Sequence, residues 1–147
     1  VRRYMNRISG PLLDRIDIQV EIVPVPFEKI SEQRPSEPSA DVRKRVEQAR
    51  AIQQQRFSDE AGVYCNAQMN SRLLHRYAVP DAESISRLKL AMERLNLSAR
   101  AYDRILKVAR TIADLDLSTD IHPHHISEAI GYRTLDRGTW GESVINR

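Results

Sequence analysis

An arginine stands at the junction between a short predicted helix and an alternating segment, within residues 9–17, Ser-Gly-Pro-Leu-Leu-Asp-Arg-Ile-Asp. The guanidinium of Arg15 stays charged at any physiological pH, and its forked donors match the oxygens of a phosphate. The same arginine could instead pair with Asp14 or Asp17 on the surface, because surface ion pairs are common and contribute little. Spacing alone favours the surface pair.

A second basic cluster lies on one predicted helix. Arg100, Arg104 and Lys107 follow one another at steps of four and three residues, which places them on one polar face. Such a face could contact phosphate. It is also the ordinary solvated side of an amphipathic helix, and spacing alone favours that interpretation.

Histidine and cysteine offer weaker candidates. His124 and Glu128 are one helical turn apart, as metal ligands can be, but no third ligand follows at helical spacing. We therefore predict a helix N-terminus with Pro123 in its first turn, and no metal site. The single cysteine, Cys65, excludes an internal disulfide and a cysteine-based zinc site, favours a reduced cytoplasmic compartment, and is predicted to be a small buried filler.

The elements that position these residues are predicted to be mainly helices. Hydrophobic residues make up 41% of the 147 residues and charged residues 29%, and only two Phe and one Trp are present, so the core must be aliphatic. Residues 1–8 and 11–15 predict two short helical pieces. Residues 16–22 alternate strictly between apolar and polar and predict the one convincing strand. Since a strand needs a partner, its sheet should lie in another molecule or in a preceding part of a longer protein.

Beyond the strand, Pro24, Pro26, Pro35 and Pro38 predict an irregular linker over residues 24–39. Apolar periodicity then predicts helices over 40–57 and 71–77, from Pro80 onward, over 98–115 with Ser98 as N-cap, and from Pro123 onward. Residues 40–133 should form a stable helical bundle, and residues 134–147 a mobile tail.

The segment around Arg15 resembles the Leu-Leu-Asp-Arg-Ile/Phe-Asp segment of magnesium-chelatase-like AAA+ ATPases. Residues 97–115 resemble the sensor-2 helix of the same proteins, and residues 125–133 fit their bacterial YifB/ComM group. The resemblance implies that Arg15 is an arginine finger that reaches the γ-phosphate held by a neighbouring subunit. It also implies that Arg100 and Arg104 contact nucleotide phosphate, with the choice between own and neighbouring nucleotide left open.

The same resemblance implies a domain plan. Residues 1–23 would be the end of an α/β core, residues 24–39 a linker, residues 40–133 a helical lid and residues 134–147 the tail. The whole protein would be a cytoplasmic hexameric ATPase that uses ATP and Mg²⁺ and acts on branched DNA in recombination. These 147 residues contain no Gly-x-x-x-x-Gly-Lys-Ser/Thr loop, so alone they should neither hydrolyse ATP nor hold the cofactors.

Two other functions stay open. One is a non-enzymatic helical module that binds nucleic acid or protein through the basic helix from Arg43 to Arg56. The net charge of +3 permits such a partner without arguing for it. The other is a pure assembly domain in which Arg15 and Arg100 have no phosphate role. No apolar run approaches the length of a membrane span.

Overall fold

The computed structural model describes residues 12, 15–20, 22, 24–27 and 36–133, and this part of the chain is mainly helical. The elements follow the order α4 (Ser39–Arg56), the 3₁₀ helix η1 (Asn66–Gln68), α5 (Ser71–Tyr77), α6 (Ala82–Arg94), α7 (Ala99–Leu115) and α8 (Pro123–Gly131). The helices predicted beyond residue 39 are confirmed in type and, to within two residues, in position, whereas most of the helical piece predicted over residues 11–15 lies outside the described residues. The predictions for residues 1–8 and 134–147 lie outside the described residues.

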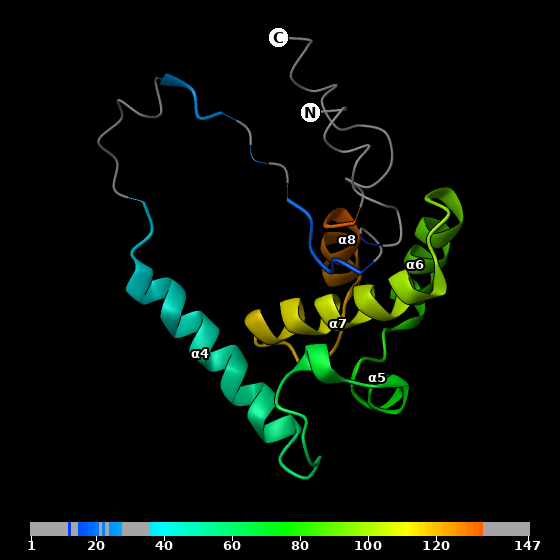
Figure 1. Ribbon diagram of the computed structural model, residues 1–147, viewed down its shortest axis with the longest axis horizontal. Coiled ribbons are helices and arrows are strands. Elements are labelled where there is room, and N and C mark those ends of the chain that lie inside the picture. Colours follow the sequence, from blue (N-terminus) through cyan, green and yellow to red (C-terminus); the bar gives the residue numbers. More distant parts are fainter. Residues whose placement is uncertain (1–11, 13–14, 21, 23, 28–35, 134–147) are drawn as a thin grey trace.

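Helix α7 is the centre of the bundle. It contacts α8, the end of α4, η1 and α5, while α6 packs on α8 (Figure 1). The Oγ of Ser98 accepts a hydrogen bond from the backbone N–H of Ala101 at 3.2 Å, which confirms Ser98 as the N-cap. Alanines at 101, 109 and 113 are fully buried, and their small side chains let the neighbouring elements approach α7 closely.

The core is aliphatic, as the composition predicts. It joins the buried side of α7 to side chains from α5, α6, α8 and the loops around them: Phe57, Met69, Leu73, Leu74, Leu88, Ile105, Leu106, Ile112, Ile121 and Ile126. Not every apolar side chain on these helices is buried. Ile85 on α6 is half exposed, because the α6 face that packs inward is centred on Leu88.

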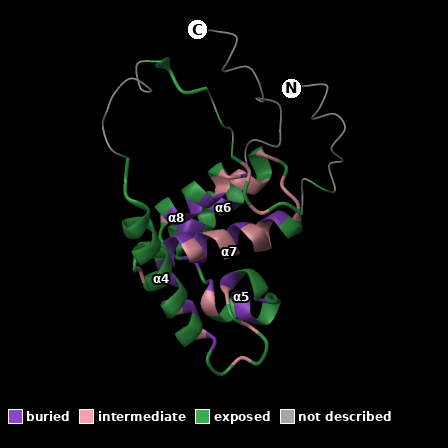
Figure 2. Cartoon of the chain, turned by 60° about the vertical axis from the view of Figure 1, so that its left-hand side comes forward, coloured by how far each residue is buried: buried purple, intermediate pink, exposed green. Residues whose placement is uncertain are grey.

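Helix α4 contributes to the core only at its C-terminal end. Ala49 and Gln53 are buried there, together with Phe57 just beyond the helix, whereas Val42 and Val46 are exposed. The apolar periodicity of residues 40–57 would place Val42 and Val46 on the same buried face as Ala49, and this is wrong for the first half of α4. The physical reason is that this half projects away from the other helices (Figure 1), and Figure 2 colours it as exposed.

The predicted strand over residues 16–22 is also wrong where the structure describes it. Residues 16–20 and 22 form no strand, and the isolated bridge between Pro80 and Ile121 is the one β-type pairing within the described residues. Alternation makes a segment able to pair but supplies no partner. The segment instead crosses the bundle and is held by hydrogen bonds from Gln19 N to Tyr132 O at 3.0 Å and from the Arg133 guanidinium to Ile16 O at 2.5 Å.

Candidate functional site

The first three turns of α7 form one wall of a polar pocket. Arg100, Arg104 and Lys107 line this pocket of about 420 Å³ together with Asp17, Ala67 and Asp103. The volume lies within the range of small-molecule sites. The structure thus brings the predicted basic cluster to one face, and it adds an acidic residue from the segment before the bundle.

The three cations differ in how far they are already engaged. Arg100 is exposed and has no hydrogen-bond or ion-pair partner among the described residues. Arg104 is 28% exposed and donates to Oδ1 of Asp17. Lys107 donates from Nζ to the backbone oxygen of Ala67 at 2.9 Å. Burial lowers the pKa of Lys107, and the positive charge of Arg104 lowers it further.

Arg15 is two residues before Asp17 in sequence, and Asp17 lines this pocket. The Arg15 backbone N–H donates to Leu12 O at 3.0 Å, which closes a single turn, and its side chain is exposed. Asp17, two residues later, is the residue that contacts Arg104. The segment that contains Arg15 therefore rests against the same helix that contains Arg100 and Arg104. Sequence reasoning had considered Asp17 only as a local partner of Arg15.

The other end of α7 contains a buried charge network that sequence reasoning missed. Asp114, which is 1% exposed, accepts two hydrogen bonds from the Arg56 guanidinium, at 2.7 and 2.5 Å. It also accepts from Asn66 Nδ2 at 2.7 Å and from Arg110 Nε at 3.1 Å. The remaining donors of Arg110 reach backbone oxygens of the loop after α7: Thr119 O at 2.8 Å and Ser118 O at 2.6 Å. Asp114 therefore joins α4, η1 and α7.

A local signal for this network was present. Arg110 and Asp114 are four residues apart on the apolar side of α7, where charged residues are found only when they are paired. Arg56, in contrast, is 58 residues from Asp114 in sequence, and no spacing rule connects the two. The predicted basic contact surface from Arg43 to Arg56 is also reduced, because Arg56 is mostly buried in the network and Arg45 pairs with Glu37 at 2.5 Å.

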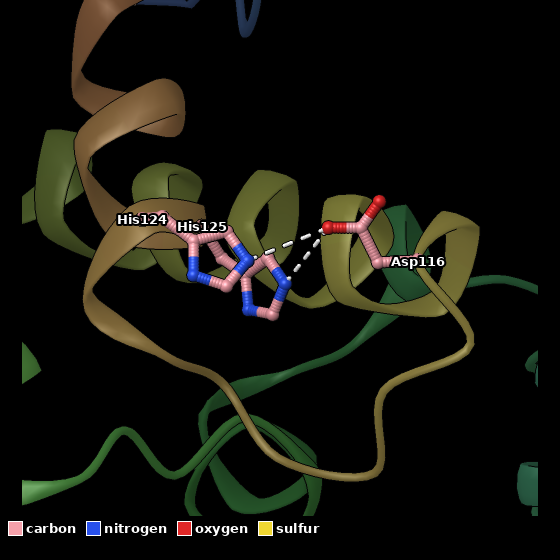
Figure 3. Close-up of side chains that lie close together, drawn as sticks. All are labelled: Asp116, His124 and His125. Atoms are coloured by element: carbon pink, nitrogen blue, oxygen red, sulfur yellow. Dashed lines mark hydrogen bonds and ion pairs between the residues drawn. The ribbon is translucent and has the colours of Figure 1, made fainter.

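Three side chains near the start of α8 could in principle hold a metal ion (Figure 3). Nε2 of His125 lies 3.1 Å from Oδ2 of Asp116, and Nε2 of His124 lies 3.5 Å from the same oxygen. Both imidazoles converge on one carboxylate oxygen.

The tautomer of His125 argues for a structural role instead. Its Nδ1 accepts the backbone N–H of His122 at 2.9 Å, so the ring proton of the neutral form lies on Nε2 and is donated to Asp116. Neither nitrogen then offers a lone pair to a metal. His125 caps α8 and fixes it to the end of α7. Glu128, which is one helical turn from His124 in sequence, accepts the Tyr132 hydroxyl at 3.0 Å.

Cys65 is partly exposed and not fully buried, so its prediction as a buried filler is only partly right. It lies just before η1, where the chain turns towards α7. Among the residues that the structure describes, no helix is long and apolar enough to cross a membrane.

Comparison with protein families decides the affiliation. The family "Magnesium chelatase, subunit ChlI C-terminal" matches residues 36–133, and the family "Magnesium chelatase, subunit ChlI" matches residues 1–30. This chain belongs to the magnesium chelatase ChlI C-terminal family. The match covers α4 to α8, including the polar pocket residues on α7 and the Asp114 network.

Known members of this group are similar over most of the chain. The protein YifB of Salmonella typhimurium is 42% identical over 137 residues, which is 92% of this chain and 26% of the relative. Competence protein ComM of Haemophilus influenzae is 41% identical over 138 residues, which is 93% of this chain and 26% of the relative. A Mycobacterium tuberculosis protein is 35% identical over 132 residues, which is 90% of this chain and 26% of the relative. The chain thus spans about a quarter of the length of these relatives.

Proposed function

We propose that this chain is the lid and subunit-interface part of a hexameric AAA+ ATPase. The observation that supports this proposal is the contact between Asp17 and Arg104, which brings the Arg15 segment against the basic face of α7 in a magnesium chelatase family member. An ATPase needs fixed positive charge where phosphate charge develops during hydrolysis. Arg15 would supply it from the core side, and Arg100 and Arg104 from the lid side.

The residues of the pocket fit a phosphate chain. Arg100 has no partner among the described residues, and the Lys107 ammonium uses one of its three donors on Ala67. In the full-length protein, ATP with Mg²⁺ would be held by residues outside this chain, and these side chains would orient and neutralise its phosphate oxygens. The chain alone should then show no ATP hydrolysis.

The proposal also includes a substrate for the motor, namely DNA. One relative is named a competence protein, and the resemblance of the Arg15 and Arg100 segments implies movement on branched DNA. We extend both to this protein, as a cytoplasmic enzyme. The described cations of α4 argue less for a separate nucleic-acid module, since Arg45 and Arg56 are engaged within the chain.

Mutation of the two arginines in the full-length assembly tests the proposal. Arg15→Ala should lower ATP turnover by roughly 10³-fold while nucleotide affinity changes little, because a finger acts on charge in the transition state. Arg100→Ala should change both affinity and turnover. Mixing Arg15→Ala subunits with subunits that lack only the phosphate-binding loop should restore activity. Normal turnover by Arg15→Ala would remove the finger role and leave an assembly domain.

A further inference from the structure

The Asp17 carboxylate occupies the position in the α7 pocket where an anionic ligand would be expected. Its oxygen accepts from Arg104, which is the middle cation of the basic face. A carboxylate and a phosphate use the same guanidinium donors. Because Asp17 takes the Nη1 donor of Arg104 and has the same sign of charge as phosphate, the two anions compete for this guanidinium.

The attachment of the Asp17 segment to the bundle is incomplete. Both side-chain polar atoms of Gln19 are shielded from solvent and have no hydrogen-bond partner among the described residues, and burial of unpaired polar atoms is unfavourable. The apolar side chains on either side gain little burial, since Ile16 is 39% exposed, Ile18 52% and Val20 61%. The segment is therefore held mainly by polar contacts, and the Asp17–Arg104 pair is the one charged pair that joins its described residues to α7.

We propose that Asp17 is an internal competitor for a polyphosphate chain, so that phosphate binding to Arg104 and Lys107 releases the segment that contains Arg15 from α7. This coupling rests on the proposed function for its physiological ligand, a nucleotide triphosphate. It makes Asp17 the residue that links binding of phosphate in the lid pocket to the position of Arg15.

Between the described residues of the segment and the bundle, release would break two hydrogen bonds besides the Asp17–Arg104 pair. Gln19 N would lose Tyr132 O, and Ile16 O would lose the Arg133 guanidinium. Both backbone groups can then pair with water or with a neighbouring strand, and the buried Gln19 amide gains partners. The alternation of residues 16–22 is an advantage in that second state, since it suits pairing in a sheet.

Titration of the 147-residue chain with inorganic tripolyphosphate at fixed ionic strength tests the competition. Asp17→Asn should bind tripolyphosphate about fivefold more tightly than the unchanged chain, the size expected for removal of a partly exposed ion pair. Arg104→Gln and Lys107→Gln should each weaken binding several-fold. Glu93→Gln and Lys89→Gln on α6 are matched controls for loss of an exposed charge and should leave affinity within twofold, because neither residue lines the pocket.

Amide hydrogen exchange at Gln19 tests the release. Bound tripolyphosphate should speed exchange of this amide in the unchanged chain, and Asp17→Asn should speed it without ligand. Unchanged affinity in Asp17→Asn, unchanged exchange at Gln19 on binding, or absence of binding would each overturn the inference. The ATPase proposal has its own test in Arg15→Ala, so either idea can fail while the other stands.

Discussion

The two ends of α7 use charge in opposite ways. At the C-terminal end, Arg110 and Asp114 are buried, and every nitrogen of Arg110 has an acceptor. At the N-terminal end, Arg100 is exposed and has no partner among the described residues. Arg104 pairs there with one described residue, Asp17. One helix thus joins a closed charge network, which fixes the fold, to an open one, which is available to a ligand.

This difference indicates which residues can be substituted without loss of the fold. A buried charge that loses its partner is strongly destabilising, whereas a partly exposed one is solvated and costs little. Substitutions near Asp114 should therefore change the free energy of unfolding, whereas substitutions near Arg100 should change ligand binding.

The largest effect is expected at Asp114. Asp114→Ala should lower the free energy of unfolding by about 3–5 kcal/mol, because it leaves the Arg110 and Arg56 charges uncompensated in a buried site. Urea denaturation measures this change. Asp103→Asn, at the partly exposed pocket end of the same helix, should stay within about 0.5 kcal/mol. Similar losses for the two variants would contradict the division of α7 into closed and open ends.

Arg56→Gln should have the next largest effect, a loss of about 2 kcal/mol. It removes two charge-assisted hydrogen bonds to Asp114 and one to Asn66. Because Arg56 ends α4, amide exchange in residues 49–56 should rise more than exchange in α8. Arg50→Gln is the control on the same helix, since its side chain is exposed. Equal exchange in α4 of both variants would show that burial of Phe57 alone fixes the helix.

A smaller effect should appear with pH at the end of α7. Burial lowers the pKa of His125, and His124 and His122 lower it further, while Asp116 opposes the shift. The unfolded chain takes up its proton near pH 6.5, before the folded chain does. Stability should thus be full above that value and fall as pH decreases below it, by about 1 kcal/mol when the Nδ1 cap is lost. Thermal unfolding measures the fall, and His125→Asn should abolish this part of the slope, whereas exposed His124→Gln should leave most of it.

The smallest effect on stability is expected at the open end. Arg100→Gln should change the free energy of unfolding by no more than about 0.5 kcal/mol, because an exposed side chain without a described partner stabilises little. Thermal unfolding of this variant beside Arg110→Gln makes the contrast direct. A loss above 1 kcal/mol in Arg100→Gln would mean that the open end is also structural.

How far the sequence predicts this molecule follows from the range of each interaction. Ser98, Pro123 and the apolar periodicity act within a few turns, and they predicted the positions of α7 and α8. The Asp17–Arg104 pair spans 87 residues and the Arg56–Asp114 pair 58, and no local pattern indicates either. The strand over residues 16–22 failed for the same reason, since its partner is not fixed by its own residues. The roles of Arg15, Arg100 and Arg104 came from resemblance and stay predictions.

The projecting half of α4 has a mechanical consequence. Residues 39–48 lie outside the core, and ten helical residues extend about 15 Å. Ala49 and Gln53 are buried and Arg56 is paired with Asp114, so the second half of α4 is fixed and the helix is a lever whose pivot lies near Ala49. A tilt of about 10° at that pivot moves the tip by about 2.5 Å, given that length. A small rotation at the buried end of α4 is therefore enlarged at Ser39, the first residue of the helix.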